Sequence, residues 1–589
     1  MNMLKKIFSL LLIFTVTTAI AQREPDAVYH KIIKEYTVHE DGSYDLHNFK
    51  QLELKSHYSF NQLYGETFII YNPEYQELKI NKSYTIMKDG KKVKTPENAF
   101  NEVLPHSVST FPAYNQLREM VVTHTGLALG ATIYLDYTLS THAGMYGGLS
   151  VMENIKKQSP VKRMEIIVHA PENMPIFHKT RNLRTAPEIT EKEGVKTYKW
   201  LFRDINPHPR EGNICESSLP ALFLQSGTED VSTGINVSKI SLQLPKSLKT
   251  KTAELTENKS AGMDKVNALR HYVVNEIDYS GLQQKHVGDA IRPFSEIYKT
   301  NIATYPEKLF LLAGMIRQAG ISAYPVLIFH GGKLPVLDHN HQIKLKVDFR
   351  DDAPYICDLQ EPQNLWYSLK GKEAYPLDKG KTEQKITFDE SMNRCDFDGV
   401  MTVRGTKASA KAKLELVHHF SPYAAFGTDF QKYSSVVKGI QMDTAVVDNA
   451  TLNATKMSLR THSSKDILKK ANNYRLLEIP EIKGSVAGWD LDPLYNERTT
   501  SFKIPAVVDE NYRLELNIKD GKCFNRAIKK EMDAAFGSVA VQLKNKGDKV
   551  IISKKITLKK SCFNPIEYQQ LRKMLRMLRM EELRKIAIR

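Results

Sequence analysis

The spacing of apolar residues changes twice along the chain and divides it into three parts. Up to about residue 245 apolar side chains recur at every second position, as in "GATIYLDYTLS", where Ile133, Leu135 and Tyr137 share one face. Such alternation predicts strands of a sheet with one buried side. In "MDKVNALRHYVVNEIDY" the apolar residues stand three and four positions apart, which predicts a helix. Alternation returns after about residue 395, as in "NYRLELNIK".

We therefore predict a multidomain β plus α+β protein. A β-rich N-terminal domain is expected over residues 22–245, an α+β core over residues 250–390, and a β-rich C-terminal domain ending in a helix over residues 395–589. The Asp41-Gly42 and Asp89-Gly90 pairs between alternating runs predict hairpin turns. Many short strands with turn signals between them indicate a β-sandwich-like N-terminal domain.

Residues 1–21 have the layout of a secretory signal peptide. Lys5 and Lys6 precede a short apolar run, and the segment ends in the small-residue pattern "AIA". The run is shorter than the ~20 apolar residues that span a bilayer, and no later stretch of the sequence is long and apolar enough to do so. We expect a periplasmic protein without a transmembrane span, with association to the outer membrane through a partner as a further alternative.

The formal net charge is +16, and the basic residues are spread along the chain rather than clustered. A basic surface suits anionic lipid headgroups, cell-wall polymers or acidic partners. No recognisable nucleic-acid-binding module is present, so nucleic acid is not an expected partner. No phosphate-binding glycine loop or other cofactor motif occurs, and we expect no cofactor.

Cysteine use is too sparse for a disulfide scaffold, although export allows one or two bridges. Cys523 with Cys562, in the same terminal domain, is the first candidate pair, but spacing does not settle the pairing. No cysteine or histidine set has zinc-site spacing. The five cysteines are Cys215, Cys357, Cys395, Cys523 and Cys562.

The middle part contains the pattern from which we infer a functional site. A helix over "YPEKLFLLAGMIRQAG" has Pro306 in its first turn and Gly320 as its C-cap. The strand-like runs "SAYPVLIFH", "HQIKLKVDF" and "APYICDL" follow. The second run begins with His341, directly after Asn340, and the third carries Asp358 after Cys357.

This order resembles the transglutaminase-like (papain-like) core of bacterial envelope proteins. In that family a Gly-Asp-Cys-x-Asp-Lys segment opens the helix, and a His and an Asp on later strands complete a catalytic triad. Lys308 matches the family Lys, while His341 and Asp358 match the His and Asp. Tyr305 stands at the position of the nucleophilic Cys, and Glu307 stands for the second Asp.

The flanking regions extend the resemblance over nearly the whole mature chain. They are similar to the β-rich domain of unknown function and the β-rich tail that surround this core in Gram-negative envelope proteins. A family cysteine at the helix start gains thiolate character from the helix dipole and the nearby His. A Tyr phenol, with a pKa near ~10, is a poor substitute.

The resemblance thus implies a pseudoenzyme that binds an envelope peptide, glycan or protein in a groove near Tyr305, Asn340, His341 and Asp358. Three alternatives stay open. In the first, the chain is an active cysteine-type peptidase or amide acyltransferase with another nucleophile. In the second, it is a structural subunit of an outer-membrane assembly. In the third, the chain never had this site. Cys357 is the thiol nearest in sequence, but strand alternation predicts that it faces away from Asp358.

Two further patterns have competing interpretations. His339 and His341 form an HxH pair that suits a metal, but no third ligand has a helpful spacing, so we expect no metal site. The C-terminal segment from Pro565 to Arg589 predicts a helix with an apolar stripe and a basic face. That helix either packs on the last sheet or docks on a membrane or partner.

Overall fold

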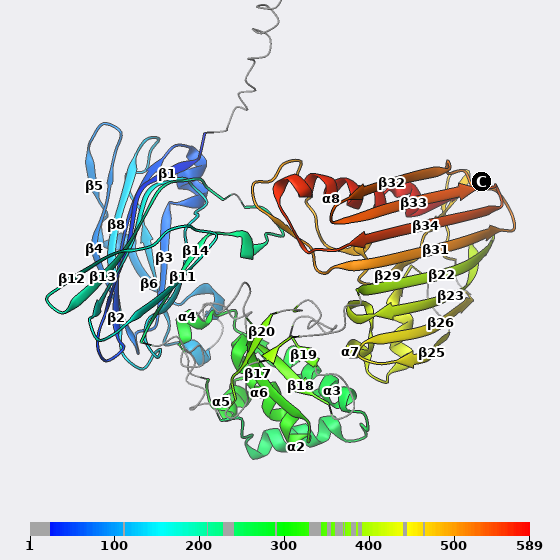
Figure 1. The fold of residues 1–589 in the computed structure, drawn as a ribbon, viewed down its shortest axis with the longest axis horizontal. Helices are drawn as coiled ribbons and strands as arrows, with labels where there is room; N and C mark the ends of the chain where they lie inside the picture. The colour runs from blue at the N-terminus through cyan, green and yellow to red at the C-terminus, as the bar shows by residue number, and fades with distance from the viewer. Residues whose placement is uncertain are drawn as a thin grey trace, which may run out of the picture.

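The protein is β-rich, with several separate sheets and a helix near its C-terminal end (Figure 1). Its structure is a computed structural model. It describes residues 24–109, 112–208, 210–227, 241–288, 291–328, 343–349, 355–359, 369, 372–378, 384–386, 392–439, 444–462 and 466–589.

An eight-stranded sheet dominates the first part of the chain. The hairpins predicted at Asp41-Gly42 and Asp89-Gly90 are present as β1–β2 and β4–β5, and both glycines have positive φ. Ile133 and Leu135 on β8 are fully buried, as the alternation predicted. In spatial order the strands are β12 (Glu188–Lys192), β13 (Val195–Ile205), β10 (Val161–Pro171), β1 (Ala27–Val38), β2 (Tyr44–Leu54), β8 (Thr132–Thr141), β4 (Gln76–Ile86) and β5 (Lys92–Lys94).

Two three-stranded sheets accompany the large sheet. Leu222 and Leu224 on β14 join Tyr36 and Val168 of the large sheet in one apolar cluster, so the two layers share a core. The smaller sheets are β11 (Ile176–Arg181), β14 (Ala221–Ser226), β9 (Ser150–Asn154), and β3 (Glu66–Tyr71), β7 (Arg118–Thr123), β6 (Phe100–Val103).

The middle part combines helices with a five-stranded sheet. In spatial order its strands are β19 (Tyr355–Cys357), β18 (Ile343–Asp348), β17 (Ser322–Ile328), β20 (Glu373–Pro376) and β21 (Gln384–Lys385). Earlier in the chain, β15 (Asp278–Tyr279) and β16 (Ile302–Ala303) form a separate two-stranded sheet. The helices are α2 (Lys246–Thr256), α3 (Gly262–Asn275), α4 (Gln284–Val287), α5 (Phe294–Thr300) and α6 (Tyr305–Gln318).

Helix α6 is the central element of the middle part. Thr304 and Glu307 form a capping box at its start, Pro306 occupies the first turn, and Gly320 follows its end with positive φ. The helix is buried from Tyr305 onward for three turns. The predicted order of elements, a helix followed by three strands, is present as α6, β17, β18 and β19.

A second eight-stranded sheet forms the C-terminal part. Tyr512, Leu514, Leu516 and Ile518 share its buried face, as the alternation predicted. In spatial order the strands are β25 (Thr444–Ala450), β26 (Ala454–His462), β23 (Lys407–Val417), β22 (Asn393–Arg404), β31 (Val508–Ile518), β34 (Lys549–Leu558), β33 (Gly537–Asn545) and β32 (Ile528–Ala534).

The C-terminal part also contains two strand pairs, a three-stranded sheet and a short helix. They are β24 (Val437–Lys438) with β29 (Glu481–Ile482), β30 (Phe502–Lys503) with β35 (Cys562–Phe563), the sheet of β27 (Lys469–Ala471), β28 (Tyr474–Glu478) and β36 (Lys585–Ile588), and α7 (Tyr423–Phe426).

The C-terminal helix α8 (Pro565–Leu578) is shorter than predicted. Its apolar residues, among them Leu571 and Met574, are buried in the core of the last sheet, so the packing interpretation is confirmed. Beyond the helix the chain pairs as β36 with β28, because Ile586 and Ile588 alternate and are both buried. Within the described residues, no helix combines the length and apolarity needed to cross a membrane.

The disulfide joins Cys215 to Cys562, so the candidate pair Cys523–Cys562 was wrong. Cys523 is a buried free thiol, and it forms a β-bridge with Ile588 near the chain end. The Cys215–Cys562 disulfide links the segment that leaves the N-terminal sheets to the start of α8. The two cysteines are 347 residues apart in sequence.

Candidate functional site

Tyr305 and Asp358, two of the four predicted groove residues, lie in contact. Tyr305 is the first residue of α6, and Asp358 directly follows β19. The phenol of Tyr305 donates a hydrogen bond to Oδ1 of Asp358 at 3.0 Å. Both side chains are buried, with Tyr305 only 3% exposed.

Lys344 on β18 is a third member of this cluster that the sequence did not reveal. Its ammonium forms an ion pair with Oδ2 of Asp358 and lies 3.4 Å from the hydroxyl of Tyr305. The run "HQIKLKVDF" gave no sign that Lys344 is buried. Strand β17 beside it is buried on both faces, so alternation is not informative here. The two lysines of β18 interrupt the continuous apolar run that would have signalled burial.

The environment keeps the Tyr305 phenol protonated. Burial raises the pKa of Tyr305 well above its usual value, and the charge of Asp358 and the hydrogen bond to it raise it further. A phenol that stays protonated at neutral pH is a weaker nucleophile than a thiolate. The cluster holds the start of α6 against β18 and the end of β19, with Asp358 as the acceptor of the phenol's hydrogen bond.

The remaining predicted groove residues, Asn340 and His341, lie outside the described residues, as does the HxH pair that includes His339. Their position relative to Tyr305 thus stays a prediction. Among the residues that are described, no group of three or more His, Cys, Asp and Glu side chains is arranged to hold a metal ion.

Cys357 has the properties of a structural thiol. It is fully buried on β19, and burial raises its pKa to about 11. Its sulfur lies 3.5 Å from the backbone oxygen of Asp358. The guanidinium of Arg270 donates to that same oxygen at 2.8 Å and fixes this turn of the chain.

We predict that Cys357 reacts slowly with iodoacetamide in the folded protein at pH 7.5, because both burial and the high pKa suppress the thiolate. Mass-spectrometric quantification of the Cys357 peptide should show little labelling over an hour, and complete labelling in denaturant. Labelling as fast as that of free cysteine would instead identify Cys357 as a reactive nucleophile.

A second buried cluster surrounds the start of α6 and contains Glu307. Arg292 contacts both carboxylate oxygens of Glu307, at 2.8 and 3.0 Å. Tyr114, from the N-terminal part, donates to Glu307 at 2.9 Å and accepts from Arg292 at 2.8 Å. Burial acts to raise the pKa of Glu307, but Arg292 and the other donors hold it below its usual value.

This cluster gives Glu307, the stand-in for the family's second Asp, a structural role. Because Tyr114 comes from the N-terminal part, the contact also joins that part to the N-terminal end of α6. Lys308 is likewise engaged, since its ammonium donates to the backbone oxygen of Ile277, just after α3, at 2.6 Å and to that of Val274, in the last turn of α3, at 3.2 Å. Burial lowers the pKa of Lys308 to about 8.

Comparison with known proteins matches family models to two parts of the chain on either side of the Tyr305 cluster. Two family models match, both described as domains of unknown function with solved structures: DUF3857 over residues 40–209 and DUF3858 over residues 479–588. A search of the curated proteins found no match.

Among solved structures, the chain is similar to that of a "putative protease" from Parabacteroides distasonis. The two are 25% identical, the alignment covers 96% of this chain and 99% of that one, and the TM-score is 0.72. The two proteins therefore share one fold along their whole length. A two-domain M1 zinc metallopeptidase bound to L-arginine also matches, with 8% identity, coverage of 39% and 52%, and a TM-score of 0.19, which is too low to support a common fold.

Proposed function

We propose that this chain is an exported, non-catalytic transglutaminase-like protein whose middle part binds an envelope peptide, glycan or protein. The observation that carries the proposal is the hydrogen bond from Tyr305 to Asp358 at the start of a buried helix. A catalytic thiol would occupy that position, poised by the helix dipole. A phenol there retains the packing of the helix and, while protonated, is a weaker acyl acceptor than a thiolate.

The charge balance of the cluster supports the same proposal. Asp358 neutralises Lys344 and accepts from Tyr305, so its carboxylate is already engaged by two buried groups. In a Cys-His-Asp triad the carboxylate instead orients an imidazole, whereas here Lys344 occupies one of its two oxygens. Cys357, the neighbouring thiol, is buried and has a raised pKa, which argues against a substitute nucleophile.

Export and a periplasmic location are part of the proposal. The signal-like segment at residues 1–21 indicates secretion. The disulfide between Cys215 and Cys562 suits an oxidising compartment, because cytosolic proteins are usually kept reduced.

The proposal is tested by assaying the purified mature protein for amide hydrolysis and acyl transfer. Casein peptides and soluble peptidoglycan fragments are incubated with the protein, and products are followed by mass spectrometry. We expect no turnover by the wild type or by its His341→Ala variant. Turnover by the wild type that disappears in His341→Ala would overturn the proposal.

An active peptidase is the second candidate, because the similar Parabacteroides structure is described as a "putative protease". It requires a nucleophile other than Tyr305. The same assay separates the two candidates: a peptidase releases new amino termini from casein, and a serine- or cysteine-directed covalent inhibitor abolishes that release. A binding protein leaves casein intact.

A further inference from the structure

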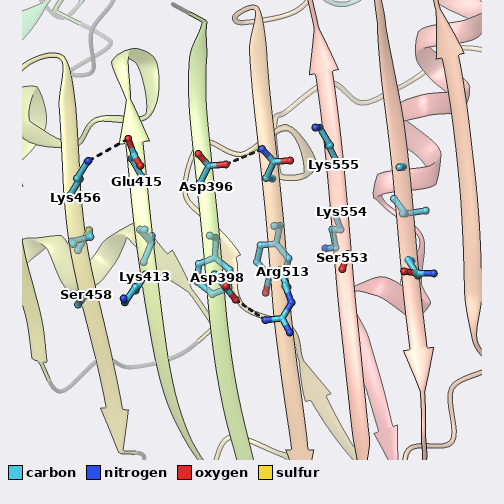
Figure 2. A pocket seen from close by; sticks show the side chains of 18 of the residues that line it. Asp396, Asp398, Lys413, Glu415, Lys456, Ser458, Arg513, Ser553, Lys554 and Lys555 are labelled. Atoms are coloured by element: carbon cyan, nitrogen blue, oxygen red, sulfur yellow. Dashed lines mark hydrogen bonds and ion pairs between the residues drawn. The ribbon is translucent and has the colours of Figure 1, made fainter.

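The C-terminal eight-stranded sheet has one covered and one open face. Helix α8 and the apolar core cover the first face. The opposite face encloses a hollow of about 730 Å³, which lies within the size range of ligand sites. Figure 2 shows this hollow from its open side, with side chains of consecutive strands standing next to one another.

Strand register arranges the floor of the hollow in two rows. One row runs through Lys456, Glu415, Asp396, Asn511 and Lys555. The other row runs through Ser458, Lys413, Asp398, Arg513, Ser553 and Gln542. Neighbouring side chains of one row are separated by the strand spacing of about 4.8 Å, so each row is a ladder of closely spaced donors and acceptors.

The acidic side chains of the floor are already paired. Asp398 accepts from Arg513 at 2.9 Å, and Asp396 accepts from Asn511 at 2.9 Å. Glu415 lies 3.9 Å from the ammonium of Lys456 and also pairs with Arg394.

Two lysines of the rows lie outside these pairs, while Asp448 at the β25 edge adds one further negative charge. Within the described part of the chain, neither Lys413 nor Lys555 forms an ion pair, although both line the hollow. At the β32 edge the two rows continue to Lys529 and Glu531, whose opposite charges balance. A ligand with anionic groups would compensate these lysines.

The carboxylates and serine hydroxyls that lie among the lysines restrict which anionic ligands can bind in the hollow. A ligand that carries charge alone would meet the carboxylates of Asp396, Asp398 and Glu415, which repel it. A ligand that also carries hydroxyl groups can donate to those carboxylates and to Ser458 and Ser553. A protein partner would need buried apolar anchors, and the exposed valines of this sheet, Val400 and Val446, are not part of the hollow lining.

We propose that this hollow is a binding site for a carboxylated oligosaccharide, with Lys413 and Lys555 holding carboxylates and the Asp, Glu and Ser side chains accepting from sugar hydroxyls. The site lies in the C-terminal part and does not depend on the function proposed for the Tyr305 region.

Isothermal titration calorimetry of the full mature protein with hexagalacturonate tests this site. We expect binding that weakens about tenfold or more in the double variant Lys413→Gln/Lys555→Gln. The control variant Lys407→Gln/Lys546→Gln removes the same charge from residues outside the hollow lining, and it should change affinity by less than about twofold. Methyl-esterified hexagalacturonate, which lacks the carboxylates, should bind about tenfold more weakly.

A third variant separates a sugar site from a site for any anion. Asp396→Ala removes a hydroxyl acceptor and a repulsive charge together. At a carbohydrate site it weakens hexagalacturonate binding, whereas at a simple anion site it strengthens it. Absence of binding up to about 1 mM, an equal loss in the control variant, or tighter binding of hexaglutamate than of hexagalacturonate would overturn the assignment.

Discussion

Replacement of Arg292 by alanine is expected to destabilise the protein by about 3–5 kcal/mol at pH 7, because it leaves the buried carboxylate of Glu307 without its cation. Glu307 is 2% exposed, and its two carboxylate oxygens accept hydrogen bonds from Nε and Nη2 of Arg292. The variant also removes the cation that lies over the ring of Tyr114, 4.5 Å from its centroid. Urea unfolding followed by circular dichroism measures the loss.

The effect should depend on pH in a defined direction. The pKa of Glu307 in the folded protein lies below its usual value of 4.5, so its stabilising contribution is present above that value and is lost as the pH falls through the folded pKa. A protonated Glu307 no longer needs Arg292. The difference between wild type and Arg292→Ala should therefore shrink at acid pH.

Arg118→Ala provides the matched control. Arg118 pairs with Glu102 at 3.4 Å, but both side chains are more than a third exposed. Its removal should cost less than about 1 kcal/mol. A loss from Arg292→Ala no larger than that from Arg118→Ala would contradict the structural role given to the Glu307 cluster.

Loss of the disulfide is the second large effect that we expect. Cys215→Ser/Cys562→Ser should lower stability by about 3–5 kcal/mol, because the bridge closes a very long loop. Backbone contacts surround the bridge: Cys215 N–H donates to Ser501 at 2.8 Å, and Ile214 forms a β-bridge with Phe502. The disulfide thus holds together two segments that are distant in sequence.

Thermal unfolding with and without dithiothreitol tests this prediction. The reductant should lower the melting temperature of the wild type and leave that of the double Ser variant unchanged. Thiol titration of the denatured, unreduced wild type should find the three free cysteines, Cys357, Cys395 and Cys523. A peptide map with Cys523 bridged to Cys562 would show that the pairing described here is wrong.

Features encoded within a few residues could be predicted from the sequence. The two Asp-Gly hairpins, the alternating strand at Tyr512 and the helix after Thr304 depend on local turn chemistry, period and capping. The disulfide pairing and the end of α8 could not be predicted, because both depend on distant segments. Residues 585–588 become a strand only because β28 offers them an edge to pair with.

Only part of the candidate site could be predicted from the sequence. Tyr305 and Asp358 were identified from the resemblance to a transglutaminase-like core, and the structure brings them together. Lys344 was missed because a sheet buried on both faces makes alternation uninformative. Arg292 and Tyr114 were missed because only the tertiary structure brings them to Glu307.

The central claim is that the Tyr305 phenol is held protonated by burial and by its bond to Asp358. NMR titration of protein labelled with [ζ-¹³C]tyrosine measures this directly, with the Tyr305 resonance assigned by its absence in Tyr305→Phe. We predict that this resonance shows no ionisation up to about pH 11, beyond the usual tyrosine pKa. Ionisation at or below pH 10 would show an activated phenolate and contradict the account.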